Sequence, residues 1–258
     1  MKNSDIQQRP LAAIIMAAGQ GKRMKNPDKA KVMHELAGVP LVAHVVDLAH
    51  GLGCTRVVVV VGHQRESVIE YLSAYDSSVE FAVQAEQLGT AHAVQMTEQG
   101  LEDFDGDIVI LSGDAPMIRT ATLENALLQH RGRQAAVTVL TAVLPDASGY
   151  GRVIRDGDGA IVRIVEHKDA NEDERAVREI NSGIYIFDRR LLFEALKKVD
   201  NNNAQGEYYL PDVFGIFQRD GRVMIPFVVD DVDEIRGVNT IEQLQEMELL
   251  YTQRRTER

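Results

Sequence analysis

The sequence of 258 residues contains a single cysteine, Cys54, and no tryptophan. One cysteine excludes an internal disulfide and a metal site built from several thiolates, as is typical of proteins in a reducing compartment. Positive charge is also scarce, since 28 Lys and Arg residues stand against 39 Asp and Glu residues and give a net charge of -11. This balance argues against a protein that neutralises a nucleic-acid backbone or an anionic membrane surface.

Long apolar segments are absent as well. No run approaches the roughly 20 apolar residues that span a bilayer, and the first ten residues, MKNSDIQQRP, lack the apolar core of a signal peptide. The seven histidines show no H-x-H or H-E-x-x-H spacing, so zinc is not expected. We therefore expect a soluble cytoplasmic protein that binds neither nucleic acid nor a membrane.

The first half of the sequence alternates regularly between strand and helix patterns. Buried strands are predicted by four apolar runs, at residues 11–18, 56–62, 79–84 and 107–114. Amphipathic segments between these runs predict helices, so we expect a mostly parallel sheet covered on both faces. Ligands of such sheets bind beyond the carboxyl ends of the strands, which is where Gly19, Gly21 and Asp114 fall.

The pattern changes after about residue 134, where strands, a hairpin with an RDGDGA turn and a polar loop follow. The predicted fold class is α/β: a Rossmann-like, mostly parallel mixed sheet sandwiched by helices, with an added β-rich portion. We expect one domain over residues 1–258, with halves at about 10–134 and about 135–239 and a C-terminal helix at 240–258. An acidic run is predicted to be a solvated loop and comprises Asp230, Asp231, Asp233 and Glu234.

The stretch IIMAAGQGKRM, residues 14–24, ends a predicted strand in a glycine-rich loop. It is not a P-loop, because Met16 stands where that motif needs glycine and Arg23 where it needs Ser or Thr. It is not a dinucleotide fingerprint, since Met24 occupies the place of a small residue. Glycines admit an anion to the backbone, so the loop predicts a phosphate site, with a solvated basic loop as the alternative. The cations concerned are Lys22, Arg23, Lys25, Lys29 and Lys31.

Nine short segments are more specific than this loop. In chain order they are AAGQGKRM, AKVMH, QAEQLGTAHA, LSGDAP, GYGR, EHKDA, EINSGI, NNNAQGEYYLPD and GVNT. Together they resemble the N-acetylglucosamine-1-phosphate uridyltransferases, within the sugar-phosphate nucleotidyltransferase superfamily, over residues 11–245. The match is to the N-terminal half of the bifunctional bacterial enzyme that makes UDP-N-acetylglucosamine. It implies the nucleotide-diphospho-sugar transferase fold, with 10–134 as the nucleotide-binding half and 135–239 as the sugar-binding half.

The reaction that the resemblance implies is attack by a sugar-1-phosphate oxygen on the α-phosphorus of UTP, with Mg²⁺ as cofactor and pyrophosphate as product. The residues that match the uridine-binding positions are Met16, Ala17, Ala18, Gly19, Gln84, Gly89 and Thr90. Ser112 and Gly113 are expected to contact substrate as well. For Gln84 and Thr90 the alternative roles are the end of a strand and the cap of a helix.

Catalytic roles are implied for three residues: Arg23 on the outgoing pyrophosphate, Lys31 near the α-phosphate and Asp114. Asp114 and Asn239 match the Mg²⁺ ligands, and one carboxylate with one amide oxygen is typical of a magnesium shell completed by phosphates and water. The sugar is matched by Tyr150, Gly151, Glu166 and Asn181, with Glu207 and Tyr208 in the pocket wall. The alternatives are solvated surface charges for Arg23 and Lys31, a purely structural acid for Asp114 and the N-terminal residue of a helix for Asn239. In the sugar-binding set they are a turn glycine and a surface carboxylate.

Three positions depart from the pattern of the family. Lys22 replaces the usual Thr and adds a cation beside the pyrophosphate site. Ala30 replaces a Pro, which is expected to loosen the loop that carries Lys31. Ser112 replaces a Tyr, which removes an aromatic wall.

The bifunctional enzyme continues into a β-helix that acetylates glucosamine-1-phosphate, and this sequence ends after one terminal helix, so we do not expect acetyltransferase activity. The sequence leaves the oligomeric state open. It also leaves two other functions open: uridylyl transfer to another sugar, such as glucose-1-phosphate, and a non-catalytic sensor of nucleotide sugars. The presence of Arg23, Lys31, Asp114 and Asn239 argues against the sensor, which has no need to hold pyrophosphate.

Overall fold

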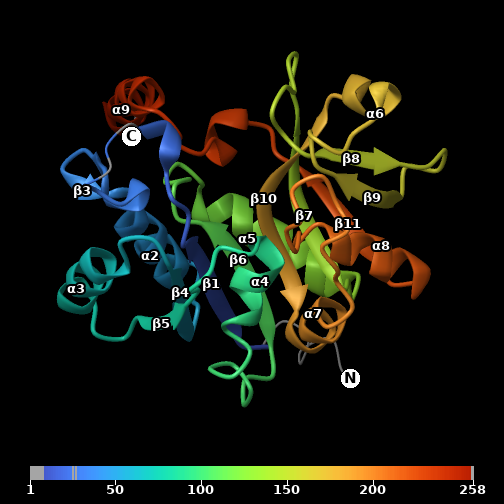
Figure 1. Cartoon of the computed structure of the whole chain (residues 1–258), viewed down its shortest axis with the longest axis horizontal. Helices are drawn as coiled ribbons and strands as arrows, with labels where there is room; N and C mark the ends of the chain where they lie inside the picture. Colours follow the sequence, from blue (N-terminus) through green and yellow to red (C-terminus); the bar gives the residue numbers. More distant parts are fainter. Residues whose placement is uncertain (1–8, 25, 27, 257–258) are drawn as a thin grey trace.

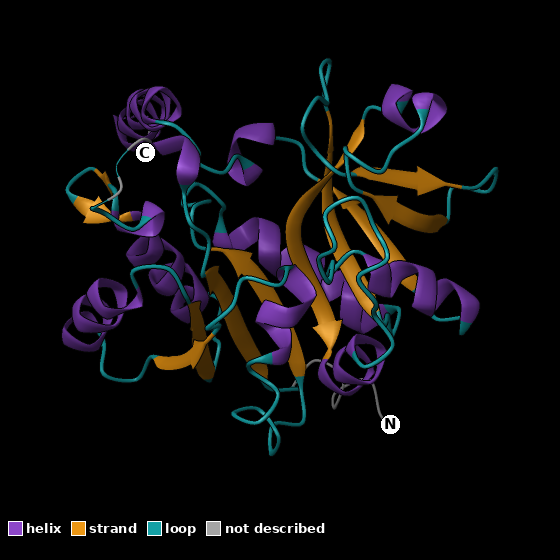
Figure 2. Ribbon diagram, viewed as in Figure 1, coloured by secondary structure: helices purple, strands orange, loops and turns teal. Residues whose placement is uncertain are grey.

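The computed structural model describes residues 9–24, 26 and 28–256, so Lys25 lies outside the described residues. A nine-stranded mixed sheet crosses this described part, with helices on both faces (Figure 1 and Figure 2). Its strands are β1 Leu11–Ala17, β4 Arg56–Val61, β5 Glu80–Val83, β6 Asp107–Ser112, β7 Val137–Val143, β8 Arg152–Arg155, β9 Ile161–Val165, β10 Glu179–Asp188 and β11 Met224–Val228. A separate hairpin consists of β2 Glu35–Leu36 and β3 Val39–Pro40.

Two layers of helices enclose the sheet. The α-helices are α2 Leu41–Gly51, α3 Arg65–Tyr75, α4 Thr90–Gln95, α5 Thr120–Gly132, α6 Glu172–Ala176, α7 Arg189–Leu196, α8 Asp212–Arg219 and α9 Ile241–Thr256, and the 3-10 helices are η1 Lys22–Met24, η2 Lys31–Met33 and η3 Val232–Ile235. The helices α2, α3 and α5 pack on one face of the sheet, and α4, α7 and α8 pack on the other. Ile14 and Ile15 are both fully buried because each faces one of these layers. None of the helices in the described part of the chain is long and apolar enough to cross a membrane.

The strands lie in the order β11-β7-β10-β6-β1-β4-β5. Because β1 pairs in parallel with both β4 and β6, the chain winds to one side of β1 and then returns to the other. Ligands of open α/β sheets bind at such a reversal, beyond the carboxyl ends of the strands. Here the Gly113 amide donates to the Met16 carbonyl at 3.0 Å and joins the end of β6 to the end of β1.

The predicted fold class is confirmed, and β1, β4, β5 and β6 begin and end within two residues of the predicted runs. Two features of this mixed sheet and its helices do not follow from the sequence patterns. Strand β10 runs antiparallel between β6 and β7, which makes the sheet mixed at this point. Helix α5 is not predicted, because few of its residues are apolar and buried, Leu123 and Ala126 among them, and the helical pattern is therefore weak.

The prediction of a solvated loop for the acidic run at 230–234 is wrong for Glu234. This side chain belongs to η3 and its residue is 1% exposed. It accepts hydrogen bonds from the Arg119 amide at 3.1 Å and from Arg119 Nε at 2.8 Å. The pair ties η3 to the residue that precedes α5, so the chain is anchored just before it reaches Asn239.

Candidate active site

The loop after β1 is anchored at both of its ends. Gly21 adopts φ +60°, and a Cβ at this position would stand 2.7 Å from Lys31 Cβ. Met24 is 2% exposed and belongs to the apolar cluster that α9 covers. Between these anchors Lys22 and Arg23 are exposed. The short helix η1 therefore presents two cations beyond the carboxyl end of β1.

Lys31, Asp114 and Asn239 meet beyond the end of β6. Lys31 Nζ donates to Asp114 Oδ2 and, at 3.0 Å, to Asn239 Oδ1. Arg23 Nη2 donates to the same Asn239 oxygen at 2.8 Å. The structure thus brings together all of the residues predicted for catalysis and metal binding, although they are spread over more than two hundred positions of the sequence.

Asp114 is 7% exposed and its surroundings restrain it. Ser112 Oγ donates to Asp114 Oδ1 at 2.5 Å, and the Val238 amide donates to the main-chain oxygen of Asp114 at 2.8 Å. A Cβ on Gly237 would stand 3.2 Å from each carboxylate oxygen, so glycine at this position keeps the space beside the carboxylate clear. The sequence patterns do not predict a role for Gly237, although it belongs to the GVNT segment.

A cavity of about 420 Å³ opens beside this cluster. It is lined by Gly19, Gln20, Gly21, Lys22, Arg23, Lys31, Gln87, Glu207 and Asn239. Glycine backbone together with three cationic side chains suits a phosphate-bearing ligand. Gln87 lines the cavity, but the sequence patterns do not predict a binding role for it. The QAEQLGT segment could have indicated this role, since Gln87 lies in it three residues after Gln84.

The three residues predicted to read uracil also connect two loops. Gln84 is 3% exposed, and its Nε2 donates to the Gly89 carbonyl at 2.9 Å. Thr90 is the first residue of α4, so Gly89 and not Thr90 is the N-cap residue. Thr90 Oγ1 accepts a hydrogen bond from the Leu210 amide at 2.9 Å. The loop before α8 is therefore fastened against these residues, and base recognition by their polar groups stays a prediction.

Three of the four residues predicted for the sugar lie together. A Cβ on Gly151 would stand 3.4 Å from Glu166 Oε1 and 3.5 Å from Asn181 Cβ. The Asn181 amide donates to the Gly151 carbonyl at 2.9 Å, and Asn181 Nδ2 donates to the Tyr185 hydroxyl at 2.7 Å. Burial raises the pKa of Tyr185, so its hydroxyl stays protonated. The fourth residue, Tyr150, lines a different cavity of about 300 Å³ beside η3.

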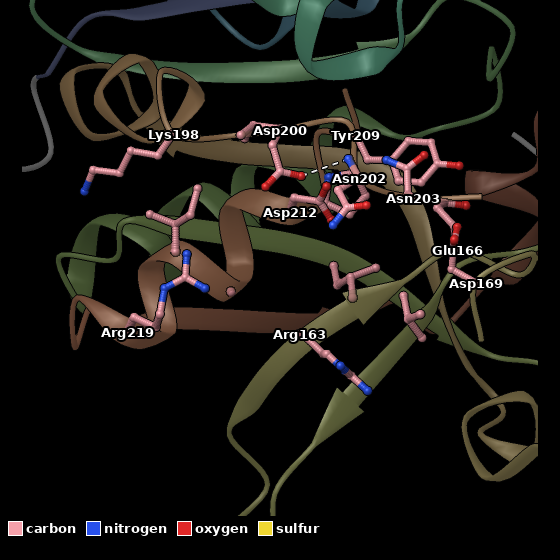
Figure 3. Close-up of a pocket in the computed structure, with 16 residues that line it drawn as sticks. Arg163, Glu166, Asp169, Lys198, Asp200, Asn202, Asn203, Tyr209, Asp212 and Arg219 are labelled. Carbon is pink, nitrogen blue, oxygen red and sulfur yellow. Dashed lines mark hydrogen bonds between the residues drawn. The ribbon is translucent and has the colours of Figure 1, made fainter. Parts of the chain in front are cut away.

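A cleft of about 410 Å³ that is lined by both acidic and basic side chains includes Glu166 (Figure 3). Figure 3 shows Glu166 and Asp169 at one end, Lys198 and Arg219 at the other, and Asp212 between them. Burial, with help from Asp169, Asp212 and Glu207, raises the pKa of Glu166. Burial also raises the pKa of Asp212 to about 6, with smaller contributions from Asp200 and Asp169.

The raised pKa of Asp212 predicts a pH-dependent stability effect. Between its ordinary pKa of 3.8 and about 6, the folded protein binds a proton that the unfolded chain releases, so the ionised carboxylate costs stability above about pH 6. Because Asp212 is only half-buried, we expect Asp212→Asn to raise the free energy of unfolding at pH 7.5 by about 1 kcal/mol. The gain should disappear as the pH falls to 4. Urea denaturation across this range measures it, and equal stability of the two proteins at pH 7.5 would contradict the assignment.

Two oxygen atoms in the cluster suit a hard divalent cation. Asp114 and Asn239 offer one carboxylate and one amide oxygen, which are the donor types that Mg²⁺ prefers. Both already bind the Lys31 ammonium, so the two oxygens converge on one cation. Within the described residues no group of three His, Cys, Asp or Glu could hold a metal ion. A metal at this position would therefore depend on oxygens from the substrate.

Comparison with known proteins adds the family and the fold. The sequence profile described as Nucleotidyl transferase matches residues 12–233. "Bifunctional protein GlmU" of Exiguobacterium sp. is 49% identical over 246 residues, which cover 95% of this chain and 54% of the relative. The protein of the same name from Streptomyces avermitilis is 49% identical over 251 residues, 95% of this chain and 51% of the relative. The chain thus spans about half the length of the curated relatives it matches.

A solved structure agrees with the observed sheet. "The Crystal Structure of UDP-glucose pyrophosphorylase complexed with UDP-glucose" superposes with a TM-score of 0.76 and covers 95% of this chain and 99% of that chain. The two sequences are 18% identical, so this likeness concerns the fold alone. It confirms the predicted nucleotide-diphospho-sugar transferase fold.

Proposed function

Because this chain belongs to the nucleotidyl transferase family, we propose that it transfers UMP from UTP to N-acetylglucosamine-1-phosphate and releases pyrophosphate. The observation that carries the proposal is the cluster of Arg23, Lys31, Asp114 and Asn239 at the carboxyl ends of β1 and β6. Supporting it are the nine sequence segments and the high identity to proteins named bifunctional GlmU. The division into a nucleotide-binding half and a sugar-binding half is part of the same proposal.

The difficulty of this reaction is electrostatic, because an anionic sugar phosphate must approach an anionic triphosphate. Catalysis therefore consists mostly of positioning and charge stabilisation, and it needs no covalent protein intermediate. Lys31 lies next to Asp114 and offsets charge near the α-phosphorus. Arg23 carries a planar guanidinium that can bind two phosphate oxygens at once, which suits the leaving pyrophosphate. Both cations line the same cavity of about 420 Å³.

Magnesium belongs to this proposal through Asp114 and Asn239, which would hold it together with phosphate oxygens and water. When bound, the ion neutralises phosphate charge and acts as a Lewis acid. The role of the chain's own residues is to orient these ligands. Ser112 donates to one oxygen of Asp114, and the main-chain amide of Asn239 donates to Gln243 Oε1 at 2.8 Å.

The acceptor sugar is assigned to Gly151, Glu166 and Asn181. The backbone at Gly151 allows a sugar ring to approach, and the Glu166 carboxylate can accept hydrogen bonds from hydroxyl groups. We place the reaction in the cytoplasm, where the buried free thiol of Cys54 would remain reduced.

Pyrophosphate release tests the proposed function directly. Each of the four nucleoside triphosphates is paired with N-acetylglucosamine-1-phosphate, glucose-1-phosphate and glucosamine-1-phosphate, with and without Mg²⁺. We expect turnover with UTP, N-acetylglucosamine-1-phosphate and Mg²⁺. Equal or faster turnover with glucose-1-phosphate would show that the acceptor is a different sugar phosphate. Nucleotide binding without any pyrophosphate release would show that the protein is a sensor and not an enzyme.

A further inference from the structure

Lys22 lines the cavity of about 420 Å³ but takes no part in the cluster around Asp114. Among the residues that the structure describes, it makes no hydrogen bond and no ion pair. The other two cations of the cavity are engaged, since Lys31 binds Asp114 and Arg23 binds Asn239. Lys22 therefore offers three ammonium donors to whatever enters the cavity.

The position of Lys22 is set by its neighbours in the loop. Gly21 at φ +60° packs closely on Lys31, and the Met24 amide donates to the Gly21 carbonyl at 2.8 Å. Since Met24 is buried beneath α9, the backbone of η1 is anchored on both sides of Lys22. Only the flexible side chain of Lys22 has to be ordered when a ligand binds.

The charge of the cavity depends on Lys22. Three cations and one acid, Glu207, line the cavity, and the carboxylate of Asp114 beside it pairs with Lys31. Lys22 is therefore the charge that makes this site positive, in a chain whose net charge is -11. A positive site in an acidic protein attracts anions, and the more highly charged anion benefits more.

We infer that Lys22 is a further substrate-binding residue, which binds the terminal phosphates of the nucleoside triphosphate and the pyrophosphate formed from them. This inference rests on the proposed function for the identity of the triphosphate, but it needs only a pyrophosphate-binding site. Because the Lys22 side chain has no hydrogen bond or ion pair with the described residues to give up, its charge strengthens binding directly. It binds pyrophosphate more tightly than it binds a nucleoside monophosphate, so it slows the release of pyrophosphate from the site.

Calorimetric titration in Mg²⁺ buffer tests the inference with inorganic pyrophosphate and UMP as probes. We expect Lys22→Thr to weaken pyrophosphate binding about fivefold to tenfold and UMP binding less than about twofold. Lys22→Arg should retain pyrophosphate affinity because it keeps the charge. Lys29→Thr is the matched control, since Lys29 lies outside the cavity and pairs with Glu35 at 3.1 Å. Unchanged pyrophosphate affinity in Lys22→Thr overturns the inference, as does an equal loss in Lys29→Thr.

Kinetics separates this inference from the proposed function. In Lys22→Thr we expect KM for UTP and the inhibition constant of pyrophosphate to rise together, KM for the sugar phosphate to stay constant, and kcat to stay constant or increase. A fall in kcat with constant KM for UTP would overturn the inference. If the wild-type chain transfers no nucleotide, the proposed function fails, and the calorimetric comparison still decides the role of Lys22 on its own.

Discussion

Replacing Asp114 with alanine is expected to lower the rate of UMP transfer by at least about a hundredfold, while the protein stays folded. The carboxylate binds Lys31 and lies where Asn239 can share a cation with it, so its loss removes the centre of the cluster. The fold should persist because the bond from Val238 to Asp114 uses main-chain oxygen, which the substitution keeps. Lys31 also borders the cavity, so its ammonium can be hydrated when the carboxylate is gone.

Steady-state rates and circular dichroism of Asp114→Ala measure these two expectations. The matched control is Asp105→Ala, which removes a fully exposed carboxylate just before β6 and should leave both unchanged. Titration of the nucleotide complex with Mg²⁺ adds a readout that does not depend on turnover, and the variant should need a higher Mg²⁺ concentration. Near-wild-type turnover of Asp114→Ala would refute the metal assignment.

The strands of the sheet could be predicted from the sequence where they are buried on both faces, because a central strand gives a short continuous apolar run. Strands β1 and β4 are continuous apolar runs, and in an α/β protein such runs are central parallel strands. The antiparallel direction of β10 could not be predicted in this way, since its apolar residues would be buried in either direction. Helix α5 could not be predicted either, because most of its residues are polar and the apolar pattern of a helix is therefore weak.

The residue types of the site could also be predicted, but its contacts could not. The resemblance marks Asp114 and Asn239, and only the folded chain brings their oxygens to the ammonium of Lys31. Glu234 belongs to an acidic run that would be solvated in isolation, and its partner Arg119 is 115 positions away. Ala30 adopts φ -56°, a value that proline shares, and it is 3% exposed, while a looser loop around Lys31 stays a prediction.

Gly89→Ala is expected to destabilise the fold strongly. Gly89 adopts φ +115°, which non-glycine residues rarely reach, and a Cβ there would stand 2.4 Å from the Tyr208 carbonyl oxygen. The Tyr208 amide donates to the Leu88 carbonyl at 2.8 Å, and the Ala91 amide donates to the Tyr208 carbonyl at 2.9 Å. An added methyl group must push these segments apart. We expect a loss of about 2–4 kcal/mol in the free energy of unfolding.

The same substitution should also affect the candidate active site, because the segment that Gly89 contacts includes Glu207, which lines the cavity of about 420 Å³. We expect Gly89→Ala to weaken nucleotide binding together with stability, since a displaced Tyr208 moves its neighbour. Denaturant unfolding and calorimetric titration with UTP measure the two effects. Gly132→Ala is the matched control: this glycine ends α5 with nothing within 4 Å of a new Cβ, so stability should change by less than about 1 kcal/mol. If Gly89→Ala behaved like the control in both measurements, the close approach to Tyr208 could not be what holds the loop beside the cavity.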